Sequence, residues 1–248
     1  MIGIILAGGN GTRLRPITNV TNKHLLPVYN KPMIYYPVEF HKSLGITEVL
    51  LTTGKEFGGE FTNLLGDGSR FGINLTYKVQ EEALGIAHAL GLAENIAKGH
   101  SMAVILGDNL FFLSNEETKS IRREVEEFAR TPEGAVIFLK RVSDPERFGV
   151  AEVDENGRVM GIEEKPKNPK SNYAVTGLYL YDSTVFEKIR RLKPSGRGEL
   201  ELTDVNNAYL LEGKLKSHLL EGEWTDAGTF DSLHRANSLA KDIQGPSV

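Results

Sequence analysis

The first half of the chain alternates short apolar segments with longer segments of helical periodicity, and this alternation restricts the fold more than any other feature. Short apolar runs predict buried strands, whereas apolar residues spaced three and four apart predict helices. Strands are expected at Ile2–Leu6, Glu48–Thr53, Ile73–Val79, Met102–Leu106 and Ala135–Lys140, and helices at Met33–Leu44, Ile86–Ala97 and Glu116–Ala129. Such alternation builds βαβ units, so the sequence predicts an α/β fold with a Rossmann-like, mostly parallel sheet flanked by helices.

The pattern changes after Pro145, where strand-like segments follow one another. Phe148–Val153 and Arg158–Glu163 flank Asn156-Gly157, and Asn-Gly is a strong hairpin signal. The other elements expected are a strand at Ala174–Tyr181, a helix capped by Thr203 that runs through Tyr209, and a final helix at Gly228–Ile243. Because no linker or repeat divides the sequence, we expect one domain over residues 1–248, with halves at about 1–140 and 145–230.

The composition excludes several classes of protein. With a net charge of −4 and no long basic block, the chain is a poor partner for nucleic acid or an anionic membrane. The apolar start is too short for a signal peptide or a spanning helix, which predicts a cytoplasmic protein. Since the chain contains no cysteine, any metal must be bound by oxygen or imidazole.

The segment LAGGNGTRLRPIT, Leu6–Thr18, concentrates glycine and arginine directly after the first expected strand. It is not a dinucleotide fingerprint, because Leu14 stands where G-x-G-x-x-G requires its last glycine, and it is not a P-loop, because no lysine follows the glycines. The backbone N–H groups of such a turn, together with Arg13 and Lys23, still suit a phosphate. The alternative interpretation is a glycine-rich turn with solvated cations.

Two aspartates stand where acidic side chains either cap helices or bind metals. Asp108 ends an expected strand at the edge where open α/β sheets bind ligands, and Asp226 precedes the last expected helix. Both interpretations stay open for each residue. Asp108-Asn109-Leu110 is not the D-x-D motif of metal-dependent glycosyltransferases, so that activity is disfavoured.

Taken together, these motifs resemble a known family. Gly8-Gly9-Asn10-Gly11-Thr12-Arg13-Leu14-Arg15-Pro16, followed by Lys23 and Leu26-Pro27-Val28, is similar to the signature of the sugar-1-phosphate nucleotidylyltransferases. Lys31-Pro32-Met33-Ile34-Tyr35-Tyr36-Pro37 resembles the short form of their glucose-1-phosphate thymidylyltransferase branch, and the likeness extends to Thr229. The resemblance implies a Mg²⁺-dependent homo-oligomer that converts dTTP and glucose 1-phosphate to dTDP-glucose and pyrophosphate.

The resemblance assigns the nucleotide to residues of the glycine loop and of two later segments. These residues are Leu6, Gly8, Gly9, Gly11, Thr12, Arg13, Gln80, Gly85 and Asp108. The Gln80 amide would pair with thymine or uracil, and the Gly85 N–H would reject cytosine, because an amide can flip whereas a backbone N–H cannot. Thymine differs from uracil by one methyl group, worth ~1–3 kcal/mol in a pocket, so some use of UTP is expected.

The resemblance also assigns the sugar phosphate and the metal to residues mainly of the second half. The sugar-phosphate residues are Asn109, Gly149, Glu164, Lys165, Val175, Gly177, Tyr179 and Arg197. Asp108 and Asp226 would bind one Mg²⁺, and the catalytic residues would be Arg13, Lys23, Asp108, Lys165 and Asp226. Two hard oxygen ligands, completed by water and phosphate, suit this ion. The second half is thus expected to be an antiparallel, β-rich sugar-binding region.

Two other functions stay open. A uridylyltransferase, or another sugar-1-phosphate nucleotidylyltransferase, would use the same scaffold. A non-catalytic subunit that binds a nucleotide sugar belongs to a different class. Such a subunit would not need to retain Arg13, Lys23, Asp108, Lys165 and Asp226 together. Because all five are present, this alternative is disfavoured.

Overall fold

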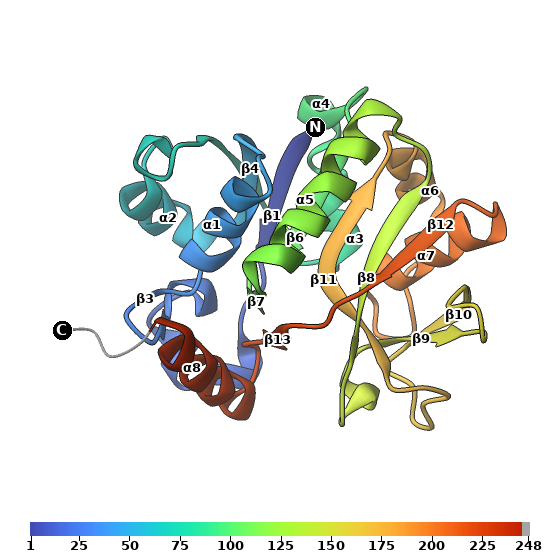
Figure 1. The fold of residues 1–248 in the computed structure, drawn as a ribbon. Coiled ribbons are helices and arrows are strands. Elements are labelled where there is room, and N and C mark those ends of the chain that lie inside the picture. Colours follow the sequence, from blue (N-terminus) through green and yellow to red (C-terminus); the bar gives the residue numbers. More distant parts are fainter. Residues whose placement is uncertain (245–248) are drawn as a thin grey trace.

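The computed structural model describes residues 1–244, and a nine-stranded sheet runs through them in the order β10-β9-β11-β6-β1-β4-β5, with β8 beside β11 and β12 beside β8 (Figure 1). The strands are β1 (Ile2–Ala7), β4 (Glu48–Gly54), β5 (Asn74–Gln80), β6 (Met102–Leu106), β8 (Ala135–Arg141), β9 (Gly149–Val153), β10 (Val159–Glu164), β11 (Tyr173–Tyr181) and β12 (Leu215–Leu219). In this sheet, only β10 and β11 run against the other strands. The expected α/β class, with a mostly parallel sheet and antiparallel additions, is confirmed.

Helices cover both faces of the sheet because alternate residues of each buried strand point to opposite sides. On β1, Ile5 and Ala7 pack with α1 (Tyr35–Ser43), α2 (Gly58–Leu65) and α5 (Asn115–Arg130). On the other face, Ile4 and Leu6 share a core with α3 (Ile86–Gly91), α4 (Glu94–Ala97), α6 (Val185–Arg191) and α7 (Leu202–Leu211). The central strands are therefore buried on both faces, which explains their continuous apolar sequences.

A third, smaller core joins the two ends of the chain. It lies under the two-stranded pairs β2 (Pro27–Val28) with β3 (Lys31–Pro32) and β7 (Asn109–Phe112) with β13 (Glu223–Asp226), and under α8 (Phe230–Gln244). Figure 1 shows α8, in dark red, beside the blue segment that carries β3. Leu14 of the glycine-rich segment is fully buried here and anchors that segment.

Several boundaries differ from the sequence-based expectations. The single helix expected at 86–97 is divided into α3 and α4, with the break after Gly91, a residue that weakens a helix interior and here lies against Ile189 of α6. The expected cap Thr203 lies inside α7, which begins at Leu202. Its hydroxyl instead bonds to Glu164. The last helix begins at Phe230 rather than Gly228.

The short elements α2, α6, β2, β3, β7, β12 and β13 were not expected from the sequence. Their apolar patterns are too brief to show a period, and the β7–β13 pair forms between distant parts of the chain. Within residues 1–244, no helix combines the length and apolarity that crossing a membrane requires.

Candidate active site

A cleft of about 460 Å³ opens near the ends of three parallel strands, where Leu6, Gln80 and Leu106 line it. This edge is where open α/β sheets bind ligands. The structure brings nearly every residue expected from the sequence into its lining: Leu6, Gly8, Gly9, Gly11, Thr12, Arg13, Lys23, Gln80, Gly85, Asp108, Asn109, Gly149, Glu164, Lys165, Val175, Gly177, Tyr179 and Asp226. Arg197 is the exception, because it does not line the cleft.

The glycine-rich segment forms one wall of the cleft. Gly11 adopts a left-handed conformation with φ 60°, and its carbonyl accepts a hydrogen bond of 2.8 Å from the Thr18 hydroxyl. A Cβ placed on Gly9 would lie 3.5 Å from Lys23 Nζ, so the ammonium group lies directly against the loop. Arg13 follows in a short 3-10 helix, Thr12–Leu14, and also faces the cleft. The loop therefore gathers two cations and turns its backbone toward the same space.

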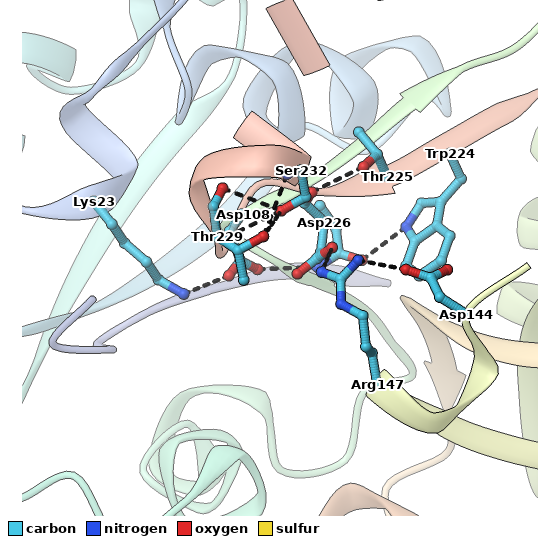
Figure 2. A network of polar contacts seen from close by, with 10 residues as sticks. Lys23, Asp108, Asp144, Arg147, Trp224, Thr225, Asp226, Thr229 and Ser232 are labelled. Atoms are coloured by element: carbon cyan, nitrogen blue, oxygen red, sulfur yellow. Dashed lines mark hydrogen bonds and ion pairs between the residues drawn. The ribbon is translucent and has the colours of Figure 1, made fainter. Parts of the chain in front are cut away.

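The two aspartates come together through the β7–β13 ladder. This ladder pairs Asp226 with Asn109, and the Ala227 N–H donates to the Asp108 carbonyl at 2.8 Å. Figure 2 shows the two carboxylates next to each other. Neither aspartate caps a helix: strand β7 follows Asp108, and Thr229 provides the side-chain oxygen that accepts from the first turn of α8. The capping alternative is therefore wrong for both.

Each of these carboxylates has a cationic partner. Lys23 Nζ forms an ion pair with Asp108 Oδ2. Arg147 donates from Nη2 to Asp226 Oδ1 at 2.9 Å and from Nη1 to Asp144 Oδ2 at 2.7 Å (Figure 2). Arg147 lines the cleft but was not expected from the sequence. Its position immediately before the Phe148-Gly149 motif is the one signal that would have indicated it.

The two carboxylates differ in their electrostatic environment. Burial would raise the pKa of Asp108, but the charges of Lys23 and His24 and the hydrogen bonds from Lys23 and Asn109 together hold that pKa below its ordinary value. Burial and then the neighbouring Asp108 carboxylate raise the pKa of Asp226, although Arg147, Arg13 and Lys23 act in the opposite direction. Two like charges in a mostly buried site repel each other, and a bound cation would relieve that repulsion.

Asn109 connects the aspartates to the sugar side of the cleft. Its Nδ2 donates to Asp108 Oδ1 at 2.9 Å, and its Oδ1 accepts from the Gly177 N–H at 2.9 Å and from Trp224 Nε1 at 2.8 Å. The pairing of β11 with β8 is interrupted between Val175 and Tyr179, which frees the Gly177 N–H for this bond. A Cβ on Gly177 would lie only 2.4 Å from the Asn109 Cγ, so this position requires glycine.

The opposite wall carries a cluster of charges around Glu164. Its Oε2 accepts from the Thr203 hydroxyl at 2.6 Å, and its Oε1 lies 3.4 Å from Lys165 Nζ. Lys165 has a left-handed backbone with φ 46°, which is unfavourable for a residue other than glycine and is typical of functional sites. The Arg197 guanidinium is exposed and bonds bidentately to the buried Glu201, at 2.8 and 2.9 Å. Arg197 therefore does not line the cleft itself, although the glutamates it contacts do.

Gly85 lies at the remaining end of the cleft, near Gln80. Its φ of 106° is accessible only to glycine without strain, and a Cβ would lie 2.5 Å from the Leu200 carbonyl. The Ala87 N–H donates to that same carbonyl at 3.0 Å, and the Leu200 N–H donates to Leu84 at 2.9 Å. These bonds tie the loop after β5 to the segment before α7.

The acidic side chains of the cleft supply only some of the oxygen ligands that a hard divalent cation needs. No group of three or more His, Cys, Asp or Glu side chains suited to a metal occurs within residues 1–244. Asp108 and Asp226 supply two carboxylates, and water or substrate phosphate would have to complete the coordination, which is the usual arrangement for Mg²⁺ at phosphate-transfer sites. The adjacent like charges are consistent with such an ion.

Comparisons with known proteins agree with this geometry. The nucleotidyl transferase family model matches residues 2–243. The glucose-1-phosphate thymidylyltransferase of Neisseria meningitidis is 46% identical over 98% of this chain and 84% of its own length. The corresponding protein of Neisseria gonorrhoeae is 48% identical over the same shares.

Solved structures of related proteins also resemble this chain. A Bacillus anthracis protein assigned as a glucose-1-phosphate thymidylyltransferase, crystallised with a sucrose, is 54% identical, has a TM-score of 0.90, and is matched over 100% of this chain and 98% of its own. A UDP-glucose pyrophosphorylase complexed with UDP-glucose has a TM-score of 0.84 over 97% of this chain and 98% of its own, but only 22% identity, so it shows the fold alone. The chain belongs to the nucleotidyl transferase family and, within it, to the glucose-1-phosphate thymidylyltransferases.

Proposed function

We propose that this chain transfers the thymidylyl group of dTTP to glucose 1-phosphate, giving dTDP-glucose and pyrophosphate. The observation that carries the proposal is the meeting of the Asp108 and Asp226 carboxylates opposite Arg13 and Lys23 in one cleft. The names of the Neisseria relatives supply the substrate class.

The reaction needs no general base. The attacking group is a phosphate monoester whose second pKa is about 6, so it is largely ionised near neutral pH. The obstacle is the approach of one polyanion to the α-phosphorus of another. Arg13, Lys23 and the glycine-loop N–H groups stabilise the triphosphate, and Lys165 and Arg197, both near Glu164, bind and orient the sugar phosphate. Positioning and charge stabilisation then supply most of the rate.

Asp108 and Asp226 would hold Mg²⁺ through one or both carboxylates. When bound, the ion supplies positive charge to the nucleotide phosphates. The residues of this chain keep the two carboxylates charged and correctly oriented: Lys23 and Asn109 act on Asp108, whereas Arg147 acts on Asp226.

In this proposal, residues of about 1–140 bind the nucleotide and residues of about 145–230 bind the sugar and complete the metal site. Gly149, Glu164, Val175, Gly177 and Tyr179 would contact the sugar. A homo-oligomer is the arrangement expected from the family resemblance.

The test compares dTTP, UTP, CTP and GTP with glucose 1-phosphate and Mg²⁺, and measures pyrophosphate release. The proposal expects the highest kcat/KM with dTTP and a smaller value with UTP, because one methyl group accounts for ~1–3 kcal/mol. A higher value with UTP would make the chain a uridylyltransferase. No pyrophosphate with any nucleotide would favour the non-catalytic binding subunit.

A further inference from the structure

The Gln80 amide nitrogen at the end of the cleft has two polar neighbours. Nε2 donates to the Glu82 carbonyl at 2.9 Å and lies 3.3 Å from His88 Nδ1. Gln80 is only 5% exposed and lines the cleft, whereas His88, on α3, does not line it. His88 therefore contacts a residue of the cleft without lining the cleft itself.

These contacts determine which way the amide points. A carbonyl only accepts hydrogen bonds, so a reversed amide would place Gln80 Oε1 against the Glu82 oxygen. When His88 carries its proton on Nε2, a reversed amide would also bring Oε1 against the Nδ1 lone pair. The network therefore directs Nε2 away from the cleft and leaves Oε1 as the atom that meets a ligand.

The position of Oε1 supports this orientation. A Cβ placed on Gly8 would lie 2.1 Å from Gln80 Oε1, so the oxygen lies against the glycine loop. No donor to this oxygen is recorded in the part of the chain that the structure describes, residues 1–244. Turning the Gln80 amide to suit cytosine would break the bond from Nε2 to the Glu82 carbonyl and would change the contact with His88 Nδ1.

We propose that His88 is a positioning residue for nucleotide specificity: it fixes the Gln80 amide so that Oε1 accepts from thymine or uracil and repels cytosine. The proposal rests on the proposed function. Thymine and uracil carry a hydrogen on N3 that Oε1 can accept, whereas N3 of cytosine carries a lone pair. An oxygen that cannot exchange places with Nε2 therefore discriminates between these bases in addition to Gly85.

The test replaces His88 and measures the preference for the base rather than turnover alone. H88L removes the ring nitrogen Nδ1 and keeps a side chain of similar size, and H88A removes it with a smaller side chain. H88N keeps a polar atom that can accept a hydrogen bond on Cγ, the carbon to which Nδ1 is attached in histidine. The matched control is H100L, because His100 is exposed and does not line the cleft. For each variant, kcat/KM is measured with dTTP and with dCTP, and calorimetry measures the binding of dTDP and dCDP without turnover.

We expect the dTTP-to-dCTP ratio of kcat/KM, and the matching ratio of affinities, to fall about tenfold in H88L and H88A, which is the scale of one hydrogen bond. H88N and H100L should keep the wild-type ratio. If H88L and H88A weaken both nucleotides equally, or leave the ratio unchanged, His88 does not orient the amide and the proposal fails. If the wild-type protein does not use dTTP, the proposed function fails instead, so the two results are distinguishable.

Discussion

At the scale of single residues, the acidic groups of the cleft are each matched to a cation. Asp108 is paired with Lys23, Asp226 with Arg147, and Glu164 lies near Lys165. Burying a carboxylate without such a partner is costly, so the pairs allow these acids to lie close together before a substrate arrives. Arg13 differs, because it forms no ion pair with any residue between 1 and 244. Its guanidinium is available for a ligand.

Replacement of Arg13 tests whether its guanidinium binds a substrate phosphate. R13A should lower kcat by ~10²-fold or more, the scale of losing one preorganised donor to a developing charge. Pyrophosphate release at saturating dTTP and glucose 1-phosphate provides the measurement. R15A is the matched control, since Arg15 is exposed and does not line the cleft, and it should keep near wild-type turnover. Equal turnover of R13A and the wild-type protein would refute the assigned role.

The Mg²⁺ dependence of the reaction tests the proposed role of Asp226. D226N keeps the shape of the side chain but removes the charge, so the Mg²⁺ concentration for half-maximal rate should rise at least tenfold, roughly the cost of disturbing a metal site. D144N is the control, because Asp144 bonds to the same Arg147 guanidinium without facing Asp108. An unchanged Mg²⁺ titration in D226N, or an equal rise in D144N, would argue against metal binding by Asp226.

At the scale of elements, sequence reasoning succeeded where the apolar pattern is long and local. The strands around Ile2, Glu48 and Met102 form as expected, because burial on both faces demands continuous apolar residues. The β7–β13 pair could not be expected, since Glu223–Asp226 contains a single large apolar residue, Trp224, and finds its partner across the whole second half. Sequence motifs assigned the residues of the site. That Asp108 and Asp226 lie close together, however, depends on the pairing of β7 with β13.

The same limit explains two differences between the expected and the observed site. Arg147 was missed because its role depends on where Asp226 lies, which the local sequence does not indicate. Arg197 was expected to bind the sugar phosphate, and in the structure its guanidinium is paired with Glu201, four residues along the chain, without lining the cleft itself. Motifs identify the type of residue a site needs, whereas the partners of long charged side chains depend on tertiary contacts.

The contact between α5 and β12 predicts a pH dependence of stability. His218 Nδ1 lies 2.8 Å from Glu124 Oε2, and this partner raises the pKa of His218 above its ordinary value of 6.5, against the effect of burial. A raised folded-state pKa stabilises the fold fully below the unfolded pKa, and that contribution is lost as the pH rises through the folded value. H218Q should thus be less stable than the wild-type protein at about pH 5.5, by up to about 1 kcal/mol.

Urea unfolding of both proteins at about pH 5.5 and pH 8.5 measures this difference. The gap in the free energy of unfolding should shrink at the higher pH, where the wild-type histidine also loses its proton. H234Q, at an exposed position of α8, controls for a general effect of removing a histidine. A gap of the same size at both pH values would show that the pair contributes no charge-dependent stability.

At the scale of the whole molecule, the cleft joins segments from both ends of the chain. Arg13 and Lys23 come from the first residues, whereas Asp226 comes from β13, immediately before the last helix. A Cβ on Gly228 would lie 2.7 Å from Arg13 Nη2, so the two ends are in direct contact. A ligand that bridges them can bind well only when the third core under α8 is folded, and binding should therefore stabilise the entire domain.

Thermal unfolding with dTTP, in the absence of sugar, tests this coupling. At a hundredfold excess over Kd, binding adds about 2.7 kcal/mol, which raises the Tm of a domain of this size by about 5–10 °C. If Asp226 binds Mg²⁺ as proposed, part of this rise should disappear in D226N when Mg²⁺ is present. In EDTA, the same dTTP concentration should give wild-type and D226N proteins equal, smaller shifts. If Mg²⁺ did not increase the shift of the wild-type protein, or increased it equally in D226N, the last strand would not take part in nucleotide binding through the metal.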